Sequence, residues 1–226
     1  MGLFIIGGIF SFIGMLLSGR LKSKFEQYSQ VGLSNNLSGR EIAEQMLRHY
    51  GIHDVKVQLS EGFLSDHYNP ADKTVNLSEM VYNGRSVSAA AVSAHECGHA
   101  VQHATSYSML QLRSGIVPIV KFSTTIQQFL MPVALMTASS FMGKWILLIT
   151  ILVYGVTTVF SLITLPVEFD ASRRALAWLE SSGNTVPQEQ AGAKDALWWA
   201  AMTYVCAAMA ALVSLLYLIM QYQRRN

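Results

Sequence analysis

The sequence predicts a mostly α-helical membrane protein in which about four transmembrane helices carry a small α+β domain. Charged residues make up only 13% of the 226 residues, which is about half the share that is usual in soluble proteins. Four stretches contain no Asp, Glu, Lys or Arg: residues 1–19, 122–143, 145–167 and 196–223. The charges gather in the rest of the chain, whose composition is close to that of a soluble domain. This segregation excludes a plain soluble globule, a disordered chain and a fibrous protein.

The predicted transmembrane helices cover residues 1–19, 115–142, 145–166 and 197–220. The last two reach the length of about 20 apolar residues that crossing a bilayer requires. The first lacks the basic residues and the small-residue cleavage site of a secretory signal peptide, so we expect an uncleaved signal anchor. The second contains Lys121, Gln127 and Gln128, and its alternative is an amphipathic or re-entrant helix.

Four spans place the two large polar regions, 20–114 and 167–195, on the same side of the membrane and the tail 221–226 on the other. The two regions contain nine and three Lys or Arg residues. Because positive charge concentrates on the cytoplasmic side of membrane proteins, we expect both regions to be cytoplasmic. Arg224 and Arg225 in the tail argue in the opposite direction.

The charge balance and the cysteines bear on partners and compartment. A net charge of +2, with no run of Lys or Arg longer than a pair, gives no support for a nucleic-acid partner. Cys97 lies in a polar segment and Cys206 in the middle of the last span. We therefore expect no disulfide between them, and a reducing compartment.

Local signatures in the region 20–114 predict an α+β domain. Ser38 and Glu41 have the spacing of a capping box, which opens a helix that runs to Tyr50. Residues 55–59 alternate like a short strand. Residues 66–78 predict a hairpin turned at 69–72, with 74–77 as its return strand. From Ser86, an N-cap residue, the chain becomes Ala-rich and predicts a second helix.

This second helix contains the sequence His95-Glu96-Cys97-Gly98-His99. Four residues advance a helix by about 400° and about 6 Å, so both imidazoles project from one face and can bind one metal ion. Tetrahedral zinc takes such nitrogen ligands, and Glu96 can take the proton of a water molecule beside the ion. The alternative is two incidental histidines on a solvated helix, which the Ala- and Val-rich surroundings disfavour. We therefore predict a zinc site with Glu96 as general base.

Hydrolytic zinc sites have three protein ligands, so one more is needed. His103 continues the same helix face but lies ~12 Å along the axis from His95, and His67 on the hairpin could face substrate or solvent. Glu168 follows the third span, and the two spans between it and the motif return the chain to the same side. We therefore predict Glu168 as the third ligand, in the first turn of a helix that begins at Pro166.

The sequence resembles the YugP-like neutral zinc metallopeptidases, a family of small bacterial membrane proteins. The resemblance is carried by S-G-x-E-I-A at 38–43, D-H-Y-N-P at 66–70, A-H-E-C-G-H-A-x-Q-H at 94–103 and L-P-V-E-F-D-A-S-R-R-A at 165–175. Together with the spacing of the spans, it covers nearly the whole chain. A wider similarity links the chain to the HtpX-like and CAAX prenyl endopeptidases, in which H-E-x-x-H and a later E-F-x-A-D supply the zinc ligands.

The resemblance implies a zinc metalloendopeptidase in the bacterial plasma membrane, with a zincin-like domain on its cytoplasmic face. The resemblance supplies no substrate; we expect a peptide or protein substrate that is associated with the membrane, and a role in the quality control of membrane proteins. Ser172 stands at the position that matches the final Asp of the wider pattern. Asp170 is then the candidate for a carboxylate that orients a ligand histidine. Neither a cleavage specificity nor an oligomeric state is indicated.

Other parts of the machinery remain open at this level. Candidates for stabilising the oxyanion or contacting substrate are His103, His67, Tyr68, Arg173 and Arg174. The return strand 74–77 could present an edge to an extended substrate, or it could be a purely structural part of the hairpin.

Two other classes of function are weighed against the peptidase. A non-catalytic zinc-binding membrane interaction protein would need a closed set of four His or Cys ligands, but Cys97 points about 200° away from His95 around the helix. An intramembrane protease would need its motif within about 20 apolar residues, whereas Arg85 precedes the motif and His103 follows it.

Overall fold

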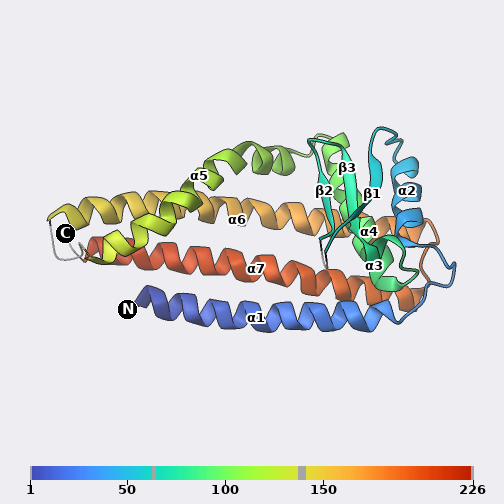
Figure 1. The fold of residues 1–226 in the computed structure, drawn as a ribbon, viewed down its shortest axis with the longest axis horizontal. Coiled ribbons are helices and arrows are strands. Elements are labelled where there is room, and N and C mark those ends of the chain that lie inside the picture. Colours follow the sequence, from blue (N-terminus) through green and yellow to red (C-terminus); the bar gives the residue numbers. More distant parts are fainter. Residues whose placement is uncertain (1, 63–64, 137–140, 225–226) are drawn as a thin grey trace. The chain divides into compact units, whose positions relative to one another are not determined.

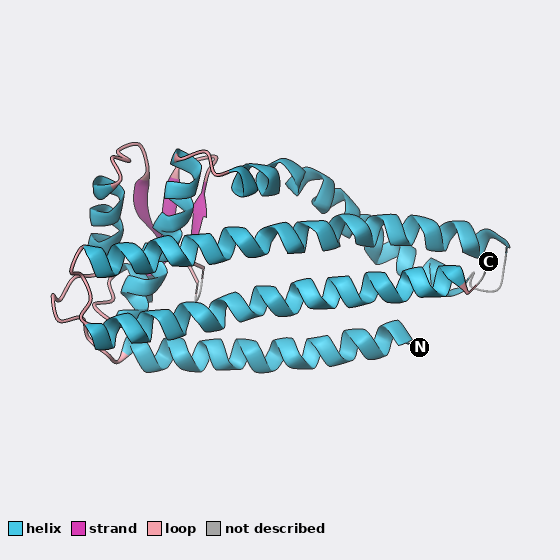
Figure 2. Ribbon diagram, turned by 180° about the vertical axis from the view of Figure 1, so that it is seen from behind, coloured by secondary structure: helices cyan, strands magenta, loops and turns pink. Residues whose placement is uncertain are grey.

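The structure is a computed structural model that describes residues 2–62, 65–136 and 141–224, and it is mostly helical with one small sheet (Figures 1 and 2). The chain divides into two compact units. The first, here called the span unit, comprises Met1–Leu16, Gln111–Leu165 and Thr203–Asn226. The second, called the site unit, comprises Leu17–Leu110 and Pro166–Met202.

Among the residues that the structure describes, three helices are long and apolar enough to cross a membrane. They are α1 (Gly2–Ser29), α6 (Phe141–Ser181) and α7 (Pro187–Gln223). Helix α5 (Ser108–Met136) covers most of the predicted span 115–142 but is not one of these three within the described residues. The total of four spans therefore stays a prediction.

The expectation that a new helix begins at Pro166 is wrong. Helix α6 runs without interruption from Phe141 to Ser181 and contains Pro166 in its interior. Proline removes one backbone donor and disturbs one turn, and long apolar helices tolerate such a defect because the remaining hydrogen bonds and the neighbouring helices hold them together. Glu168 thus lies in the interior of a helix and not in its first turn.

The site unit contains the predicted α+β elements. Helix α2 (Gly39–His49) begins with the capping box, in which Ser38 and Glu41 each accept a hydrogen bond from the other's backbone N–H. The remaining elements are β1 (Lys56–Ser60), β2 (His67–Asn69), β3 (Thr74–Ser78), α3 (Glu79–Tyr82) and α4 (Val87–Ala104). Figure 1 shows α4 beside the three strands. The predicted hairpin and the two predicted helices are confirmed.

The sheet has the order β1-β3-β2, with β1 parallel and β2 antiparallel to β3. The return strand 74–77 is therefore central. Of the two alternatives left open for it, an edge for substrate is excluded and a structural part of the hairpin stands. Residues of β1 pair with β3 across a crossover that local sequence patterns do not reveal, and every residue of β3 is buried. The two edge strands of the sheet are β1 and β2, and β2 is the one that packs beside α4.

The core of the site unit lies between α2, α4 and the sheet. Ile42 and Met46 of α2 are fully buried, as are Val75 and Leu77 of β3. The small side chains of α4, including Ala90, Ala91 and Ala94, are also buried, and they let neighbouring elements come close to its backbone. Helix α4 is therefore a central, firmly packed support for the polar residues it carries.

Candidate metal centre

Helix α4 holds His95 and His99 one turn apart on the same face. The helix begins at Ser86, whose hydroxyl accepts a hydrogen bond from the amide of Ala89. The two imidazole rings lie edge to face, with centroids 4.9 Å apart. Because both rings stand on a buried helix, their positions are fixed by the core beneath them.

Glu168 of α6 reaches both imidazoles. Its Oε2 lies 3.4 Å from Nε2 of His95 and 3.6 Å from Nε2 of His99, and its side chain is only 4% exposed. One ligand atom from each of the three residues lies within 4.8 Å of the other two. The three residues that the sequence proposes as ligands therefore come together, although Glu168 is far from the histidines in the sequence.

Gly98 explains how α6 comes so near to α4. A Cβ atom at this position would lie 2.6 Å from the carbonyl oxygen of Ala171, closer than such atoms approach in real structures. The backbones of the two helices therefore meet where α4 has no side chain, five residues beyond Pro166 on α6. This contact places Glu168 against the two histidines.

Each imidazole has a polar partner at the nitrogen that faces away from Glu168. The Nδ1 of His95 lies 3.1 Å from the hydroxyl of Ser172, and the Nδ1 of His99 lies 3.0 Å from Oε1 of Gln102. Such partners orient the ligands of metal sites. The sequence singled out Ser172 as a departure from the wider pattern and gave no role to Gln102. A signal was available, since Gln102 follows His99 by three residues and so shares its helix face.

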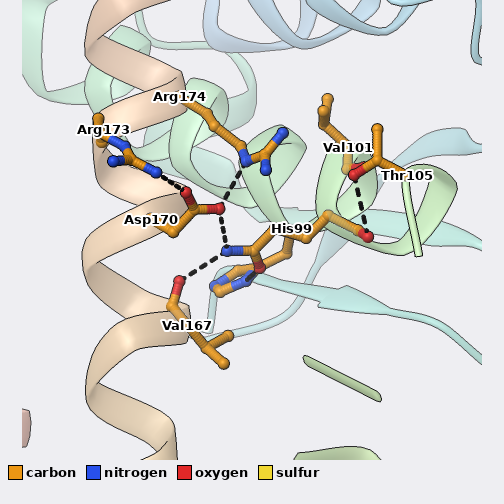
Figure 3. Close-up of polar contacts among 8 residues, drawn as sticks. His99, Val101, Thr105, Val167, Asp170, Arg173 and Arg174 are labelled. Carbon is orange, nitrogen blue, oxygen red and sulfur yellow. Dashed lines mark hydrogen bonds and ion pairs between the residues drawn. The ribbon is translucent and has the colours of Figure 1, made fainter. Parts of the chain in front are cut away.

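Asp170 joins this arrangement through Gln102, and Figure 3 shows Asp170 with Val167 and His99 around this contact. The amide nitrogen of Gln102 donates to Oδ2 of Asp170 at 3.0 Å and to the carbonyl of Val167 at 2.8 Å. Asp170 is outside the three-residue ligand group. The carboxylate that the sequence suggested for orienting a histidine is therefore connected to His99 through an amide.

The two arginines both face Asp170. The guanidinium of Arg174 donates to its Oδ2 at 2.6 Å and lies over the ring of Tyr107, and Arg173 pairs with its Oδ1. Figure 3 shows the two guanidinium groups converging on the carboxylate. Their contacts are with Asp170, and an oxyanion role for either arginine stays a prediction.

Glu96 lies beside the ligands and is nearly buried, with 8% exposure. Its Oε2 accepts a hydrogen bond of 2.9 Å from the backbone amide of Tyr68 in β2. The edge strand therefore fixes one oxygen of this carboxylate. An ionised carboxylate accepts hydrogen bonds at both oxygens, which leaves Oε1 able to contact a further group.

The other candidate residues form a neighbouring cluster. The hydroxyl of Tyr68 lies 2.7 Å from Nδ1 of His103, and both side chains line a cavity of about 120 Å³ together with Asp54 and Lys73. His67 is exposed, with Nδ1 2.8 Å from the carbonyl of Ser65. His103 is absent from the ligand group formed by the described residues, as its position along α4 predicts.

The pKa values of His99 and Cys97, two ionisable residues on α4, are both raised, but for different reasons. Burial lowers the pKa of His99, but its hydrogen bond with Glu168 and the charges of Glu96 and Glu168 outweigh burial and raise the pKa. A proton and a metal ion therefore compete for this imidazole. Burial raises the pKa of the Cys97 thiol, which donates to the carbonyl of Ala43. Cys97 is thus a packed thiol that points away from the ligand group.

The donor chemistry of the group fits zinc. Two imidazole nitrogens and one carboxylate oxygen are the protein ligands of one class of catalytic zinc sites, in which the fourth position is left for water or substrate. The donors come from two packed helices and are nearly buried. His95, His99 and Glu168 could therefore hold a zinc ion with one position open.

Comparisons with known proteins agree with this site. The model of a family described as "putative neutral zinc metallopeptidase" matches residues 3–223. The chain is 42% identical to the "putative membrane protease YugP" of Bacillus subtilis (strain 168) over 202 residues, which are 89% of this chain and 88% of that protein. No solved structure matches the chain. The length of both matches shows that the chain belongs to this family of neutral zinc metallopeptidases.

Proposed function

We propose that the protein is a membrane-embedded zinc metalloendopeptidase that hydrolyses peptide bonds of protein substrates at the cytoplasmic membrane surface. The observation that carries the proposal is the convergence of His95, His99 and Glu168 within 4.8 Å, with the carboxylate of Glu96 next to them on α4. Membership of the family supports the same reaction.

Each residue of the group has a distinct task in the proposed reaction. His95, His99 and Glu168 would hold zinc, which supplies a Lewis acid that polarises the scissile carbonyl and acidifies water. Glu96 accepts the proton of the attacking water and returns it to the leaving amine. The hydrogen bond from the amide of Tyr68 holds Glu96 in place for both transfers. Tyr68, His103, His67, Arg173 and Arg174 are the candidates for contacting substrate or the oxyanion.

The meeting of His95 with Glu168 also supports four spans. Residues on the same side of a membrane are separated by an even number of crossings. Helix α6 is long and apolar enough to cross, so α5 must cross as well for Glu168 to reach His95. We therefore propose spans at 1–19, 115–142, 145–166 and 197–220, with regions 20–114 and 167–195 in the cytoplasm and the tail 221–226 outside. The excess of Lys and Arg in the two regions supports this orientation.

The attachment of the proposed site to membrane helices indicates which substrates it can reach. A site attached directly to membrane helices reaches peptides and proteins that are at or in the bilayer, and the low net charge gives no support for nucleic acid as a partner. We propose membrane-associated proteins as substrates and quality control of membrane proteins as the role.

The second candidate function is a non-catalytic membrane protein that uses zinc to hold its fold. Such sites are closed by a fourth protein ligand. Cys97, the nearest further candidate in the sequence, donates its thiol to the carbonyl of Ala43 and so faces away. The set of three described ligands stays open, which favours catalysis.

The test combines metal analysis with proteolysis. Purified protein should contain one zinc per chain and should cleave an unfolded test protein, and both properties should disappear together on chelation and return with zinc. A protein that binds zinc but leaves the test protein intact, with the Glu96→Gln variant indistinguishable from the parent, would support the structural role.

A further inference from the structure

We propose that Gln102 is a positioning residue that sets the tautomer of His99 and couples this ligand to helix α6. The inference rests on the proposed zinc site and extends it to a side chain that does not touch the metal. Gln102 is fully buried and its amide contacts three groups: His99, Val167 and Asp170. Its side chain thus links a ligand on α4 with the segment of α6 that carries Glu168.

The partners of the Gln102 amide fix its orientation. A carboxamide has one side that donates two hydrogen bonds and one that only accepts. The carbonyl of Val167 and the carboxylate of Asp170 only accept, and they lie 2.8 Å and 3.0 Å from one end of the amide. That end is therefore the NH₂ group, and Oε1 faces Nδ1 of His99 at 3.0 Å.

The orientation of Gln102 in turn fixes His99. Because Oε1 can only accept, Nδ1 of His99 must carry the proton and donate it. In a neutral imidazole the other nitrogen then has a free lone pair, which is the form that binds a metal. That nitrogen, Nε2, is the one that faces Glu168. The buried amide thus holds His99 in the tautomer that the zinc site requires.

His95 lacks an equally strict partner. Its Nδ1 lies 3.1 Å from the hydroxyl of Ser172, and a hydroxyl can donate as well as accept. Ser172 therefore orients the ring without choosing its tautomer. Of the two imidazoles, only His99 has its metal-binding form imposed by a neighbour, and that neighbour is itself anchored on Asp170 and, through Asp170, on Arg174.

The experiment measures zinc affinity by competition with a chromophoric chelator, using the full-length chain in detergent. Gln102→Leu keeps the size of the side chain but removes the acceptor, and we expect zinc to bind about 10–100-fold more weakly, the usual cost of losing such a partner. The matched control is Gln190→Leu, because Gln190 also donates to a carbonyl of α6, that of Leu176 at 2.8 Å, and contacts no ligand. Its zinc affinity should equal that of the parent.

A spectroscopic measurement separates this role from a general effect on folding. In the zinc-free protein with nitrogen-15-labelled histidine, at a pH at which the ring is neutral, the proton of His99 should lie on Nδ1 in the parent and in Gln190→Leu. In Gln102→Leu it should move toward Nε2, because the acceptor that holds it on Nδ1 is gone. Weaker zinc binding together with this change of tautomer in Gln102→Leu would establish the role.

Two results would overturn it: parent-like affinity in Gln102→Leu, or an unchanged tautomer of His99 in that variant. His99→Ala serves as the reference for the site itself. If His99→Ala keeps its zinc, the proposed metal site is wrong. If it loses zinc while Gln102→Leu binds normally, only the role of Gln102 fails.

Discussion

The backbone amide of Tyr68 donates a hydrogen bond of 2.9 Å to the carboxylate of Glu96. Tyr68 pairs with Val75 in the ladder between β2 and β3, and its amide points away from β3 toward α4. The edge strand therefore uses an outward-facing amide to hold the proposed general base. This relationship ties the conformation of the hairpin to the chemistry of the site.

Replacement of Glu96 by Gln tests the general base directly. The glutamine oxygen can still accept the hydrogen bond from Tyr68 but cannot accept a proton, so the fold and the bound zinc should be retained. Peptidase activity should fall by roughly 10²–10⁴-fold, measured as cleavage of an unfolded test protein at equal zinc content. Cleavage at the parent rate would show that another group takes the proton.

Metal content should distinguish the third ligand from its neighbours. Glu168→Ala removes one of three donors and should abolish stable zinc binding, whereas His103→Ala should keep the metal because His103 pairs with Tyr68 and not with the ligand group. The measurement is zinc per chain after gel filtration, with helix content checked by circular dichroism. Full zinc in Glu168→Ala combined with loss in His103→Ala would reverse the assignment.

Gly98→Ala tests the close approach of α4 and α6. The added methyl group would lie 2.6 Å from the carbonyl oxygen of Ala171, so the helices must separate. We expect a loss of about 1–3 kcal/mol in the free energy of unfolding, as overpacking usually costs, together with weaker zinc binding. Gly155→Ala on α6 is the control, since nothing lies within 4 Å of its added Cβ. Equal stability and zinc affinity in the two variants would contradict the account of Gly98.

Cysteine labelling tests the orientation in the membrane. In a background without Cys97 and Cys206, cysteines introduced at Asp72 and Gly183 should react only with reagents that reach the cytoplasm. A cysteine at Asn226 should react from outside. The prediction fails if the first two positions label from opposite sides, because His95 and Glu168 could not then share one site.

Local chemistry made part of the fold predictable. The capping box at Ser38 and Glu41, the hairpin turn and the helix with His95 and His99 each depend on residues within a few positions of one another. Such signals can be recognised one segment at a time. The approach of Glu168 was predictable in a different way, from counting the spans between it and the motif.

The features that escaped prediction depend on distant partners. The pairing of β1 with β3 makes the return strand central. No residue within the hairpin indicates that a third strand pairs with it. Pro166 has the local signature of a helix start, yet the apolar helix around it continues. The spacing of Gln102 from His99 places both on one helix face, but the hydrogen bonds of Gln102 with Val167 and Asp170 depend on a segment some 65 residues away.

The contact at Gly98 has a consequence for biogenesis. The histidines at 95 and 99 are synthesised some 70 residues before Glu168, so a nascent chain carries two of the three proposed ligands until α6 has been made and has docked against Gly98. On this assignment the set of three ligands is complete only after the third predicted span and the segment that follows it have been made. A chain that stops before Glu168 carries two of the proposed ligands and has no complete metal site.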